Sequence, residues 1–387
     1  MQITVIQEKE HLHGLRRPWN DLLLRCPLPS VYLTWEWLFT WWEVFGDASR
    51  QLHILLVHDT HGKLKAIAPF LIHQKTVARM MMCNVLEFLG TGEEEQDEVC
   101  SNYLDVMAEG TEELVFNAIV QYLREGLEQG KWHQISLRGL SRQSPLYALL
   151  TDPRQVRYNG VSLSIHTHPA ACAVIHLPAE WTEYMTGLSK KWRDQIKRGR
   201  KELADLGAID CRNITDLKEL PQAFAAFQDL HQRKWASQGR AGLFASEKFS
   251  SFHKRIIQLF GENRWAAVRH LLFCGRLVAA SYNFQFQKNV YFYLPAYDPD
   301  FKTKIGLGLI ERSFDIEAAI QEGNKVYDFY KAKAGNYKWH LAKDQREVVD
   351  LVVSKKDIVF FVLSQLRFMK AAARKVKRLC LGNPRSS

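Results

Sequence analysis

The chain has 387 residues, carries a formal net charge of +10 at pH 7, and is 47% apolar and 24% charged. This is the composition of a globular protein of two or three domains, and it excludes a disordered or fibrous chain. No apolar run approaches the roughly 20 residues that cross a bilayer, and the seven cysteines lack CxxC spacing. We therefore expect a cytoplasmic protein with reduced thiols.

The first half of the chain predicts a helix, a β-hairpin, a third strand, an amphipathic helix and a final strand. The hairpin is indicated by two apolar runs that flank a tight turn at His61-Gly62-Lys63. In chain order, the expected elements are a helix at 35–46, strands at 52–59, 64–72 and 102–107, a helix at 113–130 and a strand at 131–140.

The second half repeats this order. Its hairpin turn is at Cys274-Gly275-Arg276. The expected elements are a helix ending at 258–261, strands at 264–273, 277–286 and 289–298, a helix at 306–323 and a strand at 324–333. The order predicts an α/β (α+β) protein with two tandem domains, each a mixed β-sheet flanked by helices, at 1–165 and 166–345.

The two halves differ where their amphipathic helices begin. Gly306 and Gly308 open the helix of the second half, where backbone N–H groups and the positive end of the helix dipole favour a phosphate. The equivalent helix of the first half follows Gly110 and begins near Glu112 and Glu113, whose carboxylates would repel a phosphate. We therefore expect the second half to bind a phosphate-bearing donor.

The strand at 324–333 continues into a segment rich in titratable groups, YDFYKAKAGNYKW (327–339). Asp328, Lys331, Tyr337 and Lys338 fall within 11 positions at one strand end. Such groups can supply the acid and the base of a group-transfer reaction. A structural ion pair between Asp328 and a lysine is the alternative interpretation.

These features resemble a known family. The duplicated plan and the strings LSKKWRDQIKRGRKELADLG, HQRKW, GRLVAASYNF, PAYDPDFKTKIGLGLI and YDFYKAKAGNYKW are similar to the CelD/FemAB-like branch of the GNAT acyltransferases. The similarity covers most of 20–345 and is clearest from 185 to 340. Two departures stand out: Thr303 occupies the position of an Arg or Gln in the GNAT pyrophosphate loop, and Tyr330-Lys331 replaces Leu-Arg after Asp-Phe.

The resemblance implies tandem GNAT-like domains that use acetyl-CoA or a longer acyl-CoA as co-substrate. No metal is expected, because neither a second Cys pair nor an HExxH motif accompanies His166 and His168. It also implies transfer to an amine or hydroxyl, often of a surface-polysaccharide or cell-envelope precursor. Fem proteins use aminoacyl-tRNA instead, but no inserted helical arm of the Fem type is evident in this sequence. A donor loop at Lys302, Thr303, Lys304, Gly306 and Gly308 follows from the resemblance.

Catalytic roles are expected for four residues. Asp328 or His231 would act as base or orient the acceptor, Tyr337 as acid, and Lys338 would stabilise negative charge. Because His231 and Trp235 are neighbours at i, i+4 on a helix, a purely structural pair is the alternative. Substrate contacts are expected from Arg193, Lys197, Arg198, Trp235, Tyr297, Asp298 and Lys331.

Two basic segments indicate an anionic partner. Seven cations lie between Lys190 and Lys201, on a helix predicted at 188–206. The segment 346–387 is expected to be a basic amphipathic unit. We expect an anionic sugar or lipid-linked acceptor and peripheral contact with the inner face of a membrane. The alternatives are a solvated helix face and a helix docked on the domain. The acidic run 93–98 is expected to be a solvated loop.

The leading hypothesis is an acyl-CoA-dependent N- or O-acyltransferase that acts on a cell-envelope or polysaccharide precursor. Attack would be direct, because no cysteine lies in a recognisable nucleophile context. Two alternatives remain. One is a Fem-like transferase that uses aminoacyl-tRNA, the nucleic acid that this hypothesis would require. The other is a non-catalytic protein that binds an anionic glycan or lipid precursor.

Overall fold

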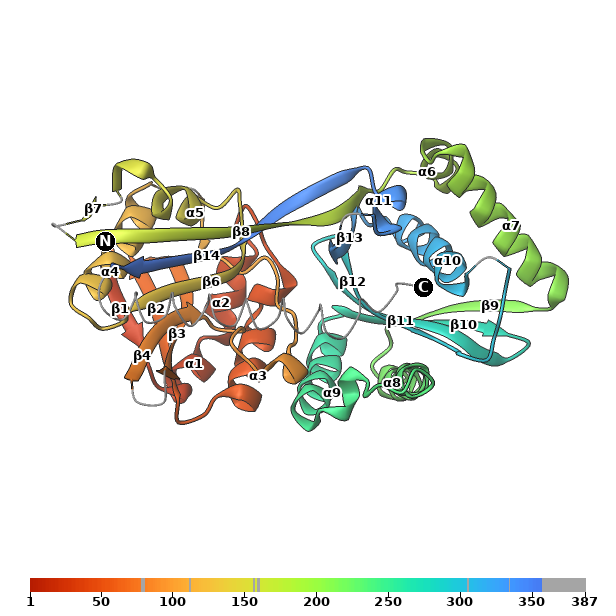
Figure 1. The fold of residues 1–387 in the computed structure, drawn as a ribbon, viewed down its shortest axis with the longest axis horizontal. Helices are drawn as coiled ribbons and strands as arrows, with labels where there is room; N and C mark the ends of the chain where they lie inside the picture. Colours follow the sequence, from red (N-terminus) through yellow and green to blue (C-terminus); the bar gives the residue numbers. More distant parts are fainter. Residues whose placement is uncertain are drawn as a thin grey trace, which may run out of the picture.

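The structure is a computed structural model that describes residues 1–77, 81–110, 113–155, 157–158, 161–304, 306–333 and 335–356. Its strands form one long mixed sheet that runs through both halves of the molecule (Figure 1). The strand order is β1-β2-β3-β4-β6-β14-β8-β13-β12-β11-β10-β9. The mixed α/β class with helices on the sheet is as the sequence predicts.

The two halves of the sheet share one plan. In each half, a run of antiparallel strands ends in one parallel pair, β4 with β6 and β12 with β13. The first half contains β1 (Gln2–Ile6), β2 (Arg50–His58), β3 (Leu64–Val77), β4 (Met81–Phe88) and β6 (Gln134–Ser141). The second contains β9 (Ile209–Ile214), β10 (Ala266–Phe273), β11 (Arg276–Phe286), β12 (Asn289–Tyr297) and β13 (Val326–Lys331).

The predicted hairpin turns are present in both halves. Gly62 and Gly275 each have φ of 78°, the left-handed region that glycine adopts without steric cost. The third strand of the first half differs from the prediction, because β4 takes that place beside β3. Of the predicted strand 102–107, only Met107 belongs to a strand, β5 (Met107–Ala108), although Leu104 makes an isolated bridge to Leu140.

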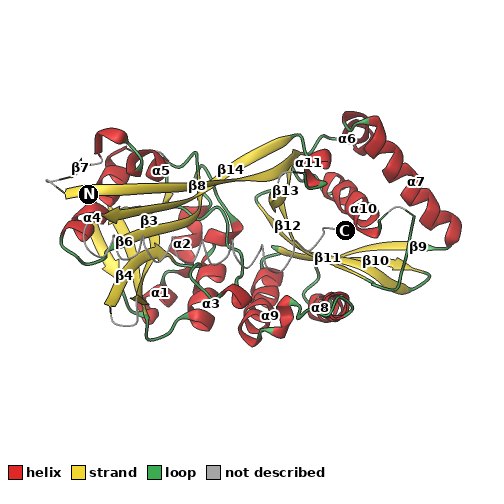
Figure 2. Cartoon of the chain, in the orientation of Figure 1, coloured by secondary structure: helices red, strands yellow, loops and turns green. Residues whose placement is uncertain are grey.

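Helices cover the sheet in both halves (Figure 2). In the first half these are α1 (Lys9–Gly14), α2 (Arg16–Leu23), α3 (Trp35–Phe45), α4 (Glu113–Glu128) and α5 (Pro145–Leu150). In the second half they are α6 (Trp181–Gly187), α7 (Lys190–Leu206), α8 (Leu220–Ala236), α9 (Glu247–Glu262), α10 (Leu307–Gln321) and α11 (Lys338–Leu341). No helix among the described residues is long and apolar enough to cross a membrane.

Two long strands join the halves. β8 (Val161–His176) and β14 (Asp344–Lys355) pair with each other along their length and bridge the two parts of Figure 1. β8 also pairs with β13, while β14 pairs with β6 of the first half. The predicted boundaries at 165 and 345 therefore fall inside strands, and 346–355 is sheet rather than an amphipathic segment. Residues 357–387 of that segment lie outside the described residues.

A single aromatic core passes between the halves. α3 packs on α9, where the rings of Trp37 and Phe252 meet edge to face with centroids 4.8 Å apart. Trp37 is fully buried, and its ring also contacts Phe284 of β11. Buried aromatic rings of this size contribute several kcal/mol each to packing, roughly 3–5 on truncation to alanine. The two halves are consequently held as one packed body.

Candidate functional site

The parallel strands β12 and β13 separate soon after they pair. Within the described residues they share three register pairs, from Asn289↔Val326 to Tyr291↔Asp328. Beyond Tyr291, β12 continues for six residues with no β13 partner. A gap therefore opens between two neighbouring strands in the middle of the sheet.

A β-bulge lies at the start of this gap. On β11, Tyr282 faces Leu294 and the next residue, Asn283, faces Phe292, so Tyr293 is the extra residue of β12. A bulge bends its strand and re-aims the side chain that it carries. The Tyr293 ring consequently lies beside the gap.

A cavity of about 530 Å³ lies against the part of β12 that has no β13 partner. Five separate segments meet around it: α7, α8, β12, the start of α10 and the start of α11. The lining residues are Trp192, Lys234, Phe292, Tyr293, Pro295, Tyr297, Gly306, Gly308, Leu309, Tyr337 and Lys338. Five of the predicted site residues, Tyr297, Gly306, Gly308, Tyr337 and Lys338, are therefore brought together. We call this space the donor cavity, after the donor-binding role that the sequence predicts for Gly306 and Gly308.

The two glycines at the start of α10 have different surroundings. A Cβ at Gly306, the N-cap, would meet no atom within 4 Å. A Cβ at Gly308 would lie 3.1 Å from the ring of Tyr297. Gly306 therefore leaves open space in front of the helix N-terminus, where a phosphate is favoured. Gly308 lets Tyr297 approach the helix.

Comparison with known proteins decides the family of this half. Residues 190–339 match the model of the acetyltransferase (GNAT) domain. This segment is a GNAT domain. The fold of the whole chain resembles FemX, with a TM-score of 0.60 and 10% identity over 94% of this chain and 99% of that chain.

Two further structures share the fold. A conserved protein of unknown function from Bacteroides thetaiotaomicron has a TM-score of 0.51 and 11% identity, over 91% of this chain and 100% of that chain. The C-terminal DUF2156 domain of an Agrobacterium fabrum protein has a TM-score of 0.52 and 10% identity, over 92% and 96%. None of the curated proteins matches the sequence.

Lys338 is the most perturbed cation of the GNAT domain's donor cavity. Burial, with the nearby Arg312 guanidinium, lowers the pKa of its ammonium to about 8. The ammonium donates a hydrogen bond to the carbonyl of Phe329 (2.6 Å) and lies 5.4 Å from the ring centroid of Phe292. Its neighbour Tyr337 also lines the cavity. Both residues can reach a ligand there.

Asp328 lies outside the donor cavity. Its carboxylate is fully buried and accepts hydrogen bonds from the Tyr103 hydroxyl (2.6 Å) and the Tyr330 N–H (2.8 Å). Arg346 lies 3.7 Å away. Burial raises the pKa of Asp328 despite these partners. The side chain predicted as a base therefore joins the two halves of the molecule.

His231 and Trp235 form the structural pair that the sequence left as an alternative. The His231 side chain is 2% exposed, and its Nε2 accepts a hydrogen bond from the Trp235 indole (3.0 Å). Burial lowers the pKa of His231 to about 4, so the ring is neutral at pH 7. The ring packs against Phe244 and lines neither the donor cavity nor a second cavity, of about 490 Å³, between the two halves.

The loop residues predicted to bind the donor flank the helix start. The Lys302 ammonium donates to the carbonyl of Pro299, and the Lys304 N–H donates to the Glu202 carboxylate (2.7 Å). Both lysine side chains are exposed, and Thr303 is half-buried between them. These residues adjoin the donor cavity without lining it.

The other predicted substrate contacts are dispersed. Arg193 donates to the carbonyl of Thr186, while Lys197 and Arg198 lie on the exposed face of α7. Asp298 is buried and pairs with Arg276. Lys331 lines a different cavity, between the two halves.

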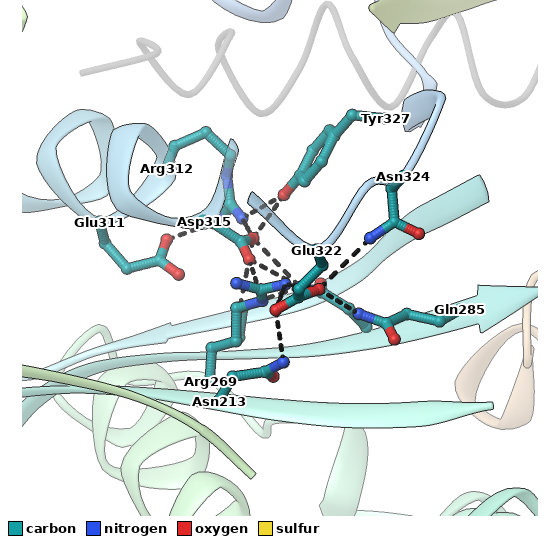
Figure 3. A network of polar contacts seen from close by, with 11 residues as sticks. Asn213, Arg269, Gln285, Glu311, Arg312, Asp315, Glu322, Asn324 and Tyr327 are labelled. Carbon is teal, nitrogen blue, oxygen red and sulfur yellow. Dashed lines mark hydrogen bonds and ion pairs between the residues drawn. The ribbon is translucent and has the colours of Figure 1, made fainter. Parts of the chain in front are cut away.

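A buried ionic network fixes α10 against the sheet (Figure 3). Arg312, fully buried, contacts Asp315, the Tyr327 hydroxyl (2.8 Å) and Glu311 (2.9 Å). Asp315 also pairs with Arg269 of β10 (2.7 Å). The Arg312 guanidinium lies 3.4 Å from the ring centroid of Phe292, which lines the donor cavity. The network thus holds Phe292, a residue of the cavity wall, in place through the Arg312 guanidinium.

Sequence reasoning missed several residues of the site. Trp192 was not among the predicted site residues, yet it lines the donor cavity and stacks on His340 with centroids 4.8 Å apart. Lys234 lies 4.8 Å from the ring centroid of Tyr297, and burial lowers the pKa of this lysine. Lys234 falls inside the quoted HQRKW string, so its cation was the available signal.

Proposed function

We propose that the chain is an acyltransferase whose acyl-CoA donor binds in the donor cavity. The observation that carries the proposal is the cavity itself, which lies at the N-terminus of α10 against the part of β12 that has no β13 partner. Gly306 leaves space there for a pyrophosphate, and the exposed Lys302 and Lys304 add positive charge nearby. The thioester would lie along β12, whose backbone has no β13 partner beyond Tyr291.

The reaction is direct transfer. The acceptor nucleophile forms a bond to the acyl carbon, the carbon–sulfur bond breaks, and the nucleophile's proton passes to a base while the thiolate takes up a proton. Backbone N–H groups on the edge of β12 that lacks a β13 partner would polarise the carbonyl. Tyr337 would protonate the leaving thiolate, and the Lys338 ammonium would stabilise its charge; both residues line the cavity.

The acceptor that we propose follows from the family resemblance. We place the enzyme in the cytoplasm, acting on a cell-envelope or polysaccharide precursor. The exposed cations of α7, including Lys197 and Arg198, lie on the same helix as Trp192 of the donor cavity. They would attract an anionic sugar or lipid-linked acceptor at the inner face of the membrane.

Calorimetric titration with acetyl-CoA and a longer acyl-CoA tests the donor site. The variant is Gly306→Glu, which places a carboxylate in the open space before α10, where it would repel a phosphate. We expect micromolar binding to the wild type and its loss in the variant. Gly14→Glu is the matched control, because a Cβ at Gly14 also meets nothing within 4 Å.

Each outcome of this titration has a clear meaning. Binding that Gly306→Glu abolishes and Gly14→Glu preserves supports a donor at the start of α10. Failure of the folded wild type to bind either thioester would overturn the acyl-CoA proposal. Equal binding by all three proteins would place the donor elsewhere.

Aminoacyl-tRNA remains a second candidate donor. The observation that favours it is the exposed basic face of α7, which leads to the donor cavity through Trp192. Transfer would then require charged tRNA and stop after ribonuclease treatment. A non-catalytic binder would instead keep its function in cells after combined loss of Tyr337 and Lys338, which line the donor cavity, and lose it when the 190–201 cations are neutralised.

A further inference from the structure

Two lysines line the donor cavity, and their ammonium groups have different surroundings. The Lys338 ammonium donates a hydrogen bond to the carbonyl of Phe329. The Lys234 ammonium, near the end of α8, makes no hydrogen bond and no ion pair with any of the described residues. An ammonium group has three N–H donors. All three donors of Lys234 are therefore available to a ligand in the cavity.

Aromatic rings flank the Lys234 ammonium instead. It lies 4.8 Å from the ring centroid of Tyr297 and 5.6 Å from that of Trp235. Such rings attract a cation but offer it no oxygen acceptor. Lys234 is half-buried, and burial lowers the pKa of its ammonium because the charge is poorly hydrated. A bound anion would supply the charge-assisted hydrogen bonds that this group lacks.

The lining of the donor cavity carries positive charge only. The described residues that line it include two lysines and no aspartate or glutamate. Lysines that are removed from water are normally paired with a carboxylate. A cavity with two cations and no counter-charge attracts an anionic ligand. This charge balance is independent of the open space that Gly306 leaves before α10.

The loop before α10 does not bring a cation into the cavity. Thr303 is uncharged, and the Lys302 ammonium donates to the carbonyl of Pro299. Neither Lys302 nor Lys304 lines the cavity. A cation for a phosphate inside the cavity therefore comes from another element.

Lys234 of α8 lies close to the start of α10. Its ammonium lies over the ring of Tyr297, and a Cβ at Gly308 would lie 3.1 Å from the hydroxyl end of the same ring. One aromatic ring therefore contacts both the cation of α8 and the first turn of α10. A ligand at that turn is within reach of a flexible lysine side chain.

We propose that Lys234 binds the pyrophosphate of the donor, with its ammonium as the counter-charge to the phosphate oxygens. The proposal rests on the acyl-CoA function proposed above and adds to it a donor-binding residue from α8, outside the loop that the sequence indicated. Gly306 leaves the space that the pyrophosphate needs, and Lys234 supplies the charge. Lys234 makes and breaks no bond, so its role is in binding rather than in the transfer step.

Calorimetric titration with dephospho-CoA tests the proposal, because this ligand keeps the pyrophosphate and has no 3′-phosphate. We expect Lys234→Met to bind it at least about tenfold more weakly than the wild type does. Lys234→Arg keeps the positive charge and should bind within about threefold of the wild type. Arg233→Met is the matched control: Arg233 is the exposed neighbour on α8, pairs with Asp229 and does not line the cavity, so this variant should bind as the wild type does.

Inorganic pyrophosphate separates this proposal from the acyl-CoA proposal. We expect the wild type to bind pyrophosphate, and Lys234→Met to bind it at least about tenfold more weakly. If the wild type binds pyrophosphate but not dephospho-CoA, the acyl-CoA donor is overturned and Lys234 still stands as a phosphate-binding residue. If the wild type and Lys234→Met bind dephospho-CoA equally, the role of Lys234 is overturned and the donor proposal stands.

Urea unfolding distinguishes a binding role from a structural one. Methionine fills similar space without a charge, and the Lys234 ammonium has no hydrogen bond to a described residue that could be lost. We expect the urea midpoint of Lys234→Met to equal or exceed that of the wild type. A lower midpoint would overturn the proposal, because the lost affinity would then reflect a loosened fold. An equal loss of affinity in Arg233→Met, no recovery in Lys234→Arg, or no binding of either ligand by the wild type would overturn it as well.

Discussion

Lys338 illustrates how burial turns an ordinary lysine into a titratable group of the site. Its pKa falls to about 8 from 10.5, first because of burial and then because Arg312 carries a like charge nearby. The sequence indicated a lysine next to a strand end, but not this neighbour, because Arg312 lies on α10. The shift makes the charge of Lys338 sensitive to mildly alkaline pH.

This shift predicts a pH dependence of stability. Between about pH 8 and about pH 10.5 the unfolded chain holds the Lys338 proton more tightly than the folded chain does. The Lys338 contribution to the free energy of unfolding therefore rises with pH over that interval. Urea unfolding of the wild type and Lys338→Met at several pH values should show that the free energy of unfolding of the wild type rises toward alkaline pH relative to that of Lys338→Met. Parallel curves would contradict the shift.

His231, unlike Lys338, is a predicted site residue that does not line the donor cavity. A histidine next to a tryptophan at i, i+4 suggested a base, but a general base needs a free lone pair near the substrate. The lone pair of Nε2 is occupied by Trp235 and the ring is buried. Only the packing of α8 against its aromatic neighbours could reveal this, because spacing along a helix does not say which face is covered.

Among the elements, α10 links the donor cavity to the buried network. Its first turn borders the cavity at Gly306 and Gly308, and its next turns carry Glu311, Arg312 and Asp315 into the sheet. Breaking a buried charge network leaves uncompensated charges, which costs far more than losing an exposed ion pair. The helix start is thus positioned by groups that do not line the donor cavity.

Removal of Arg312 should therefore destabilise the protein strongly. We expect Arg312→Met to lower the free energy of unfolding by about 3–5 kcal/mol, because Asp315 and Glu311 lose a buried cation. Arg233→Met is the control, since Arg233 pairs with Asp229 on the surface and should cost less than about 1 kcal/mol. Urea unfolding measures both. Equal losses would mean that the network contributes little.

At the scale of the whole molecule, the two halves form one structure through groups far apart in sequence. Tyr103 of the first half donates to Asp328 of the second, and β14 returns from the second half to pair with β6. Contacts of this kind couple the halves when the chain unfolds. The tandem repeat therefore does not imply two independent units.

Unfolding should be cooperative. Tyr103→Phe should lower the free energy of unfolding, and the variant should still unfold in a single transition. The substitution leaves the buried Asp328 carboxylate without one of its partners, a loss of about 1–3 kcal/mol. Calorimetry should record a single transition for wild type and variant, with a lower midpoint for the variant. Two separate transitions in the wild type would show that the halves unfold independently.

Local patterns predicted much of the fold. The hairpins at Gly62 and Gly275, the basic helix α7 and the helix that follows Gly306 appear as expected, because turn chemistry and apolar periodicity act within a few residues. The weaker pattern at 102–107 misled the assignment. There the strand position beside β3 is filled by β4, which the predicted order of elements did not include.

The residues of the candidate site also separate into those that local patterns predict and those that only long-range packing brings together. From the sequence alone came the donor helix start, Tyr297, Tyr337 and Lys338, since these lie in or beside one local motif each. The tertiary structure decided that Asp328 is a buried joint, that Lys234 and Trp192 border the donor cavity, and that part of the acidic run 93–98 lines the cavity between the halves. These relations depend on long-range packing, which fixes burial and partners that spacing along the chain does not encode.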